Sequence, residues 1–342
     1  MTKQLIPQSL PLPPHYDPLR AGDLWRVPYQ ERAVQARQWA EQYDIRPASQ
    51  DAIKIALIAI DVQNTFCLPD FELFVGGRSG MGAVEDTRRL CEFIYRNLGS
   101  ISTIVASLDT HRVMQVFHPV YLIDENGQHP APLTLISHDD VLQGRWRFNP
   151  AIAPSLGVSP QAGQQQLIYY TLQLKESGKY DLTVWPYHAM LGGIGHSLVP
   201  ALEEAIFFHT IARSTQASFI LKGEYASTES YSAIGPEVLS GPGGEIIASK
   251  DDSFMRTVIE HDLVFIAGEA KSHCVASTIA DLLEQIRAFN PGLARRVCLL
   301  EDCTSPVVVP GVIDYTDQAD AVFRGFALAG MRLLQSTELA EI

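Results

Sequence analysis

The chain has 342 residues, of which 46% are hydrophobic and 19% charged, and its formal net charge is −13. This balance is typical of a globular protein and excludes the disordered and fibrous classes. Its Lys and Arg residues are scattered and form no basic patch, so we expect neither a nucleic acid nor a membrane as a partner.

The N-terminal sequence has neither the apolar core nor the small-residue cleavage site of a secretory signal. No run approaches the roughly 20 apolar residues that cross a bilayer. The cysteines are few, odd in number and without a CxxC pair, which argues against a disulfide framework and a Cys-rich zinc site. We therefore expect a cytoplasmic protein with free thiols.

Residues 1–50 differ in composition from the rest of the chain. They carry several prolines, from Pro7 to Pro28, followed by a helical stretch at about 30–43. We interpret them as an arm that packs on the surface or on a neighbouring subunit, with a flexible tail as the alternative. The remaining residues, 51–342, are predicted to form one domain.

A regular alternation of strands and helices is predicted from residue 54 onward. The apolar runs that predict strands are 55–61, 102–109, 217–222, 262–270, 296–303 and 331–336. Helical spacing falls at 82–97, 196–208, 252–259, 272–289 and 316–329. Such βαβ units predict a three-layer α/β fold, in which a mostly parallel six-stranded sheet has helices on both faces. Ligands in such sheets bind at the carboxyl ends of the strands.

Residues 119–181 interrupt this alternation with many polar residues and prolines. Within them, QQLIYYTLQL and YDLTVW predict a β-hairpin with its turn at Glu176–Ser177–Gly178. The segment is too long for an ordinary loop, so we predict an insertion that covers an active site or a subunit interface.

Three chemically active side chains follow predicted strands. Asp61 ends the first, Lys222 ends the third, and Cys274 follows the fourth at the start of a helix. A thiol at a helix N-terminus has a lowered pKa, a carboxylate can take its proton, and an ammonium can hold the anion. Taken singly, each residue has a structural explanation as a buried thiol, a turn cap or a solvated strand end. Their combination at one edge of the sheet predicts an activated cysteine nucleophile.

A second cluster consists of Asp109 and His111, at the end of the second strand, with the distant His188. An Asp and two His can hold a divalent metal and leave positions open for water or substrate. Zinc suits these ligands, and iron or manganese would also fit. His118 is a further candidate ligand, whereas His273, next to Cys274, either faces solvent or modulates the thiol.

Five motifs in order carry a family resemblance: DVQNTF, SLDTH, WPYH, LKGEYASTESYSAI and GEAKSHCVAST. Together they resemble the isochorismatase-like cysteine hydrolases, and within them the nicotinamidases. The resemblance covers residues 53–118 and 182–336, and leaves out the arm and the 119–181 insertion. The domain at 51–342 would then be a cysteine hydrolase domain.

The resemblance implies roles for the residues above. Asp61 would deprotonate Cys274, and the thiolate would attack an amide carbonyl, release ammonia and leave a thioester for water to hydrolyse. Lys222 would complete the catalytic set. Backbone N–H groups of Ala270 and Cys274 would form the oxyanion hole, with a cis peptide before Ala270. The resemblance also assigns a metal to Asp109, His111 and His188, and stacking against the substrate ring to Phe66, Trp185 and Tyr231.

The substrate would be nicotinamide or a related small amide, and the enzyme would be a homo-oligomer. The sequence departs from the nicotinamidase pattern at Ala189, where the family has a cysteine, and at Thr110, where it has a tryptophan. It is also far longer than typical members. Two alternatives stay open: a hydrolase of the same fold that acts on another carboxamide or an N-carbamoyl compound, and a non-catalytic relative that binds a ligand.

Overall fold

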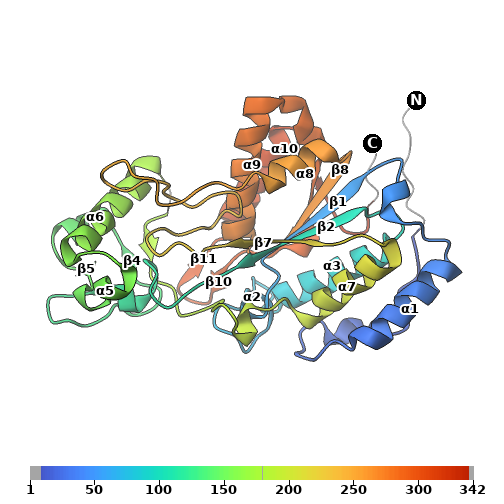
Figure 1. Ribbon diagram of the computed structural model, residues 1–342, viewed down its shortest axis with the longest axis horizontal. Coiled ribbons are helices and arrows are strands. Elements are labelled where there is room, and N and C mark those ends of the chain that lie inside the picture. Colours follow the sequence, from blue (N-terminus) through green and yellow to red (C-terminus); the bar gives the residue numbers. More distant parts are fainter. Residues whose placement is uncertain (1–8, 179, 339–342) are drawn as a thin grey trace. The chain divides into compact units, whose positions relative to one another are not determined.

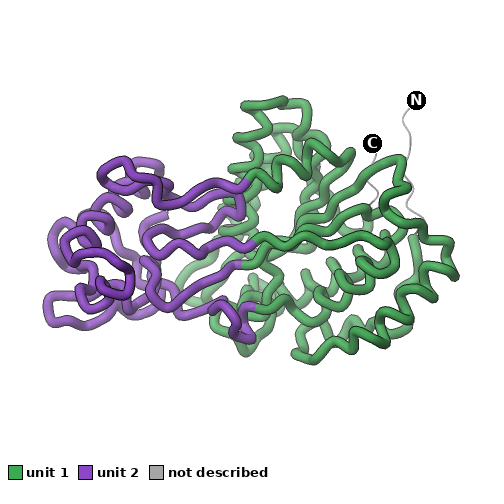
Figure 2. The backbone as a smooth tube through the Cα atoms, in the orientation of Figure 1, with its two compact units in different colours: residues 1–108, 197–220, 252–342 green, residues 109–196, 221–251 purple. Residues whose placement is uncertain are grey.

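The computed structural model describes residues 9–178 and 180–338 (Figure 1). The first eight residues of the predicted arm, Pro7 included, lie outside the described residues. The chain divides into two compact units (Figure 2). The first contains residues 1–108, 197–220 and 252–342, and the second contains 109–196 and 221–251. We describe each unit by itself.

The central sheet has the six predicted strands, in the order β12-β9-β8-β1-β2-β7. Their bounds are Ile55–Ile60 (β1), Thr103–Asp109 (β2), Ser218–Lys222 (β7), Leu263–Gly268 (β8), Val297–Leu300 (β9) and Arg332–Leu334 (β12). β1 pairs in parallel with both β2 and β8, and β9 with β8 and β12. β1 and β8 are buried along their whole length, because helices cover both faces of the sheet.

Helices of the first unit lie on both sides of this sheet, with α3 and α7 on one face and α8, α9 and α10 on the other (Figure 1). Their bounds are Gly82–Arg96 (α3), Pro200–Arg213 (α7), Ser253–Glu260 (α8), Ala276–Phe289 (α9) and Thr316–Leu328 (α10). α3 buries Leu90, Phe93 and Ile94, and the Phe93 ring lies 5.0 Å from that of Phe265 in β8. Each such buried side chain contributes about 1.5–3 kcal/mol. α7 begins later than predicted because Pro200, which lacks an N–H, occupies its first turn.

The described part of the arm packs on the first unit. Helix α1 (Tyr29–Gln42) lies along α7, and Leu10 and Trp39 are buried in the same core as α3. The Leu10 amide donates to the Arg96 carbonyl at 2.9 Å, and Arg32 pairs with the buried Glu204 of α7 at 2.8 Å. This unit also contains two short pieces, α2 (Asn64–Cys67) and the hairpin of β10 (Val308–Val309) and β11 (Ile313–Asp314).

The whole predicted insertion, 119–181, falls within the second unit. Its elements are β3 (Leu122–Ile123), β4 (Leu135–Ile136), α4 (His138–Leu142), β5 (Arg147–Phe148), α5 (Ala153–Leu156), α6 (Pro160–Ser177) and β6 (Leu182–Thr183). Its core gathers the apolar side chains of these short elements around α6, including Phe148, Leu167 and Tyr170.

The hairpin predicted within the insertion is wrong, because its first half is the helix α6. The buried side chains Leu167, Tyr170, Thr171 and Leu174 follow helical spacing. Ser159 caps the helix by accepting from the Ala162 amide at 3.1 Å, and Gly178 ends it in the left-handed conformation. The β-branched and aromatic residues of the run favour a strand locally, and the caps and the buried face outweigh that preference.

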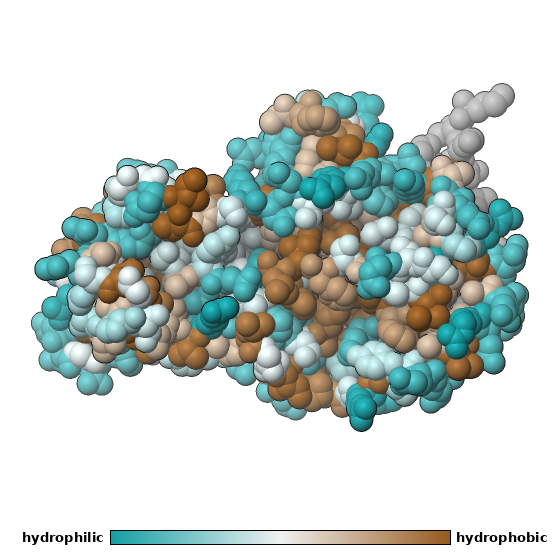
Figure 3. Space-filling model, in the orientation of Figure 1, coloured by the Kyte–Doolittle hydropathy of each residue, from teal (hydrophilic) through white to brown (hydrophobic). Residues whose placement is uncertain are grey.

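On the face shown in Figure 3, hydrophilic residues lie mainly along the periphery of the first unit, and an apolar area lies near its middle. Within the described ranges, no helix combines the length and apolar character that a membrane span requires.

Candidate active site and metal centre

Asp61 occupies the end of β1 in a fixed orientation. Its side chain is fully buried, and the Ser107 hydroxyl donates to its Oδ1 at 2.6 Å. Its backbone amide donates to the Ser107 carbonyl at 3.2 Å, and its φ is +50°, which is uncommon for a residue other than glycine. Neighbouring strand ends therefore hold this carboxylate where a general base could act.

The segment after β8 lies beside Asp61, because Ile60 pairs with Gly268 in the parallel register. Gly268 has φ +120°, and a Cβ there would come within 2.0 Å of the Ile60 carbonyl oxygen, so only glycine permits this approach. The Glu269–Ala270 peptide is cis, as the resemblance implied. A π-type turn (Lys271–Val275) then brings the buried Cys274 to the beginning of α9.

Two other residues singled out from the sequence lie in this unit. Phe66 is buried in α2. His273 is buried as well: its Nδ1 lies 2.8 Å from the Ser272 hydroxyl, and its ring packs against Tyr315 at 4.9 Å. Burial lowers the pKa of His273 to about 4, so its imidazole is neutral at physiological pH. It therefore does not face solvent.

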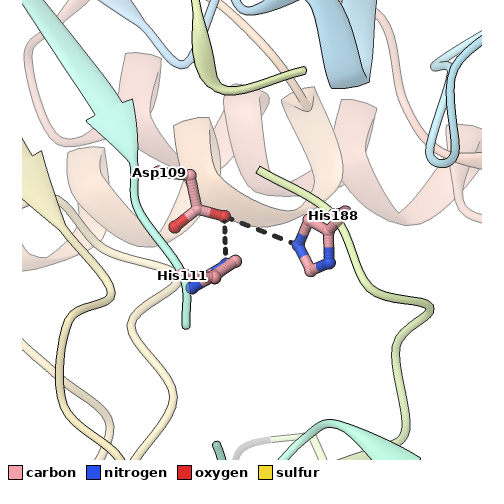
Figure 4. A group of neighbouring side chains, drawn as sticks. All are labelled: Asp109, His111 and His188. Carbon is pink, nitrogen blue, oxygen red and sulfur yellow. Dashed lines mark hydrogen bonds and ion pairs between the residues drawn. The ribbon is translucent and has the colours of Figure 1, made fainter. Parts of the chain in front are cut away.

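The three predicted metal ligands meet in the second unit. Asp109, His111 and His188 are all buried, and each offers a ligand atom within 4.8 Å of the others. His111 Nε2 lies 2.8 Å from Asp109 Oδ2, and His188 Nε2 lies 3.7 Å from the same oxygen (Figure 4). One carboxylate oxygen and two imidazole nitrogens thus converge on one point, from segments far apart in the sequence.

Backbone carbonyls fix the orientation of both imidazoles. Nδ1 of His188 donates to the Pro186 carbonyl at 2.8 Å, and Nδ1 of His111 to the Gly223 carbonyl at 3.2 Å. These bonds leave the Nε2 atoms to face Asp109, an arrangement typical of metal-bound histidines. A lone pair on His111 Nε2 and a carboxylate oxygen at 2.8 Å require a proton or a cation between them. The donor set therefore fits a divalent metal.

The charges around Asp109 favour its ionised form. Burial raises the pKa of this carboxyl, but His111 and the Lys222 ammonium oppose burial and hold it well below its usual range. Burial lowers the pKa of His188. Burial also lowers the pKa of His111, but the negative charge of Asp109 outweighs burial, and the pKa of His111 is raised overall. An anionic carboxylate beside a neutral His188 is what metal coordination needs.

Lys222, at the end of β7, connects with this cluster. Its buried ammonium donates to Asp109 Oδ1 and to the Ser230 carbonyl, each at 2.9 Å. Asp109 therefore uses one oxygen for Lys222 and turns the other toward the two imidazoles. Lys222 belongs to the second unit, whereas Asp61 and Cys274 belong to the first. The contact of Lys222 with those two residues stays a prediction.

His118 lies near the metal cluster without being one of the three. Its ring centre is 5.9 Å from those of His111 and His188. Nδ1 points to the Arg112 and Val113 carbonyls, and the buried Nε2 finds no hydrogen-bond partner within the described ranges. Burial lowers the His118 pKa to about 3, so this nitrogen carries a lone pair.

Trp185 and Tyr231, the other two residues predicted to stack against a substrate ring, contact one another. Trp185 donates from Nε1 to the Tyr231 hydroxyl at 3.2 Å.

Sequence reasoning missed Gly223 and Gln115. The Gly223 carbonyl accepts from His111 and also from the Gln115 side chain, which buttresses the site. Gly223 has φ +83°, and a Cβ there would lie 2.7 Å from His111 Cε1 and 2.8 Å from Asp109 Oδ1. A glycine directly after the strand-end lysine is the one signal in the sequence that could have indicated this close approach.

Gly223→Ala is therefore expected to weaken metal binding about tenfold or more, because the methyl group displaces both ligands. Titration of the purified variant with Zn²⁺ against a competing chelator measures this change. Gly244→Ala is the matched control: Gly244 lies in the same unit with φ +82°, and nothing lies within 4 Å of its would-be Cβ. Equal weakening in both variants would mean that backbone strain, and not the contact with the ligands, is responsible.

Among the comparisons with known proteins, only the comparison of structures finds similar proteins, and it identifies the fold. No family model matches the sequence, and no curated protein does. The solved yeast nicotinamidase bound to nicotinaldehyde aligns with a TM-score of 0.50 at 16% identity, over 82% of this chain and 99% of that one. The Acinetobacter baumanii nicotinamidase has a TM-score of 0.49 at 18% identity, with 84% and 98% covered. The N-carbamoylsarcosine amidase of Thermoplasma acidophilum has a TM-score of 0.40 at 16% identity, and the alignment covers 84% of this chain and 99% of that one. The fold is thus the isochorismatase-like α/β fold that the sequence predicted.

Proposed function

We propose that this chain is a metal-binding cysteine amide hydrolase that converts nicotinamide, or a related small carboxamide, to the acid and ammonia. The observation that carries this proposal is the buried set of Asp109, His111 and His188, whose donor atoms converge and whose rings are held by backbone carbonyls. The fold, shared with the yeast nicotinamidase, supports the same reaction class. A location in the cytoplasm and assembly into a homo-oligomer remain predictions.

The proposed chemistry begins at Cys274. Asp61 takes the proton from its thiol, and the sulfur attacks the amide carbonyl as the C–S bond forms. Backbone N–H groups of Ala270 and Cys274 receive the developing oxyanion, a contribution of about 2.7–4 kcal/mol per donor. Asp61 then returns the proton to the leaving nitrogen, ammonia departs, and water hydrolyses the thioester to regenerate the thiol. The fixed orientation of the Asp61 carboxylate supports its role as base.

The second unit would select and hold the substrate. A metal ion bound by Asp109, His111 and His188 supplies a Lewis acid that a pyridine nitrogen can ligate. Lys222, through its bond to Asp109 Oδ1, keeps the carboxylate anionic and adds a buried positive charge. Trp185 and Tyr231, which contact one another, provide aromatic surface for a planar ring, and Phe66 would do so from the first unit.

Metal removal tests the proposal directly. We expect about one divalent metal per chain in the purified protein, loss of nicotinamide turnover on chelation, and recovery on adding Zn²⁺. His188→Ala should lose both metal and turnover, because one of three ligands is gone. His129→Ala, an exposed histidine of the same unit whose Nδ1 faces the Leu122 carbonyl, is the control and should keep both. Turnover that survives complete chelation would contradict a metal-anchored substrate, and ammonia from an N-carbamoyl compound alone would favour the alternative substrate class.

A further inference from the structure

Two carboxyl groups lie buried against one another in the first unit. Asp86, in α3, is 3% exposed, and Glu269, at the end of β8, is 1% exposed. Each carboxyl group acts on the pKa of the other, and the buried Asp86 Oδ2 has no hydrogen-bond donor among the described residues unless Glu269 carries a proton. Arg89 donates from Nη2 to the other oxygen, Asp86 Oδ1, at 2.7 Å. Two carboxylate oxygens in contact repel unless a proton lies between them, so the pair holds one proton.

The proton belongs to Glu269. Arg89 places its positive charge on Asp86 and so favours the ionised form of that side chain. Burial and the negative charge of Asp86 raise the pKa of Glu269 well above its usual range. With Asp86 ionised and Glu269 neutral, the pair and Arg89 together carry no net charge, which is the favourable state in a buried site.

Glu269 also holds the segment that contains Ala270 and Cys274. Its Oε2 accepts from the Ser305 amide at 3.2 Å, and the Ser305 carbonyl accepts from the Lys271 amide at 2.8 Å. Ser305 thus binds the residues on both sides of Ala270. Ser305 reaches this position because α3 begins with Gly82, where a Cβ would come within 2.4 Å of the Ser305 hydroxyl.

No charged group that the structure describes around the pair could balance a second negative charge on Glu269. Arg89 is already committed to Asp86, and the Lys271 ammonium pairs with Asp320 at 2.6 Å. Burial raises the pKa of both Cys67 and Cys303, so neither thiol supplies charge at neutral pH. The other charged groups that meet Arg89, Glu85 at 3.9 Å and Asp302 at 4.0 Å, are acidic and supply no positive charge. Asp61, whose charge also acts on Cys67, is acidic as well.

We propose that protonated Glu269, hydrogen-bonded to Asp86, is a positioning residue that holds the Ala270–Cys274 turn in place for the amide hydrolysis proposed above, on which this inference rests. Loss of the shared proton puts two negative charges in contact and releases the turn. Activity is therefore lost at alkaline pH because Glu269 is deprotonated, and not because the nucleophile Cys274 changes its protonation state.

Glu269→Gln is the decisive variant. A glutamine amide donates to Asp86 and accepts from Ser305, as the protonated acid does, and it has no proton to lose. Because the folded pKa of Glu269 is raised, its contribution to stability is full below the unfolded pKa and is lost as pH rises toward the folded pKa. Wild-type protein should lose thermal stability over that range, and its kcat should fall above the folded pKa. Glu269→Gln should lose less thermal stability than the wild type over that range and should not show the fall in kcat. The part of the loss that remains comes from other buried acids such as Glu229, whose pKa burial raises to about 8 in both proteins.

Two further variants complete the design. Glu269→Leu removes both hydrogen bonds and should lower kcat about tenfold with little change in KM, because the oxyanion donors are misplaced. Glu85→Gln, one residue before Asp86 and half-exposed, is the control and should leave both pH profiles as in the wild type. Asp86→Asn should also abolish the alkaline loss, since a single carboxylate then faces Arg89.

The unfolding temperature and kcat, each measured against pH, separate the outcomes. Smaller alkaline losses of unfolding temperature and of kcat in Glu269→Gln than in the wild type support the inference. A smaller loss of unfolding temperature with an unchanged kcat profile overturns the positioning role, and profiles equal to the wild type in both measurements overturn the shared proton. If the wild type releases ammonia from no amide, the proposed function fails, whereas a smaller loss of unfolding temperature in Glu269→Gln still supports the shared proton.

Discussion

Cys274→Ala is expected to lower ammonia release from nicotinamide by about 10⁴-fold or more, because removal of a covalent nucleophile removes the reaction path itself. The metal content should stay at the wild-type value, since the metal ligands lie on the other unit. Rapid quenching of the wild type with substrate should trap an acyl group on the Cys274 peptide, seen by mass spectrometry.

Cys303→Ala is the control for this experiment. Cys303 is also a buried free thiol of the first unit, but burial and nearby acids raise its pKa well above the usual range, so it makes a poor nucleophile. Its replacement should leave turnover within a few-fold of wild type. Retained turnover in Cys274→Ala, or an acyl group on Cys303, would reject Cys274 as the nucleophile.

Lys222→Met is expected to affect both catalysis and metal binding. The substitution leaves Asp109 Oδ1 without its cationic partner in a buried site, a change that typically costs about 3–5 kcal/mol of stability. We expect metal affinity to fall about 10–100-fold, as for loss of a residue that supports a metal ligand. Turnover should then stay low even at saturating metal, because the proposed catalytic set has also lost its cation.

Lys250→Met provides the comparison, since Lys250 is an exposed lysine of the same unit. It should match wild type in metal affinity, kcat and unfolding temperature. Full recovery of kcat in Lys222→Met at saturating metal would assign Lys222 to the metal site alone. Unchanged metal affinity would show that the ion pair with Asp109 does not support the ligand.

The sheet was predictable because each buried parallel strand is a short, uninterrupted apolar run. Every predicted range contains its strand, and the observed ends lie at or inside the predicted ones. The Asp109, His111 and His188 cluster was predictable for a related reason: Asp109 and His111 share a strand end, and a distant histidine, His188, could complete three ligands. The run in α6 has a local strand preference that predicts a hairpin, whereas its helical periodicity and its caps determine the observed helix.

Contacts between distant elements were not predictable from one sequence. Nothing in GEAKSHC signals that Glu269 meets Asp86, because that contact exists only after α3 packs beside the end of β8. The role of Gly223 depends in the same way on where His111 and Asp109 finally lie. For the proposed catalytic set, the position of each residue at or after the end of a strand was predictable. The distances from Lys222 to Asp61 and Cys274 stay a prediction.

The packing of the arm has a practical consequence for anyone who shortens this chain. The sequence predicts a domain that begins at residue 51, yet α1 covers α7: the Tyr29 ring packs against that of Phe207 at 5.0 Å, and Trp39 is buried in the shared core. The buried Arg213 of α7 also bonds to Asp51 and to the Arg46 carbonyl. A product that begins at residue 51 would present an uncovered apolar helix face to solvent, and such a face promotes self-association and precipitation. For expression and crystallisation, the arm belongs with the rest of the chain.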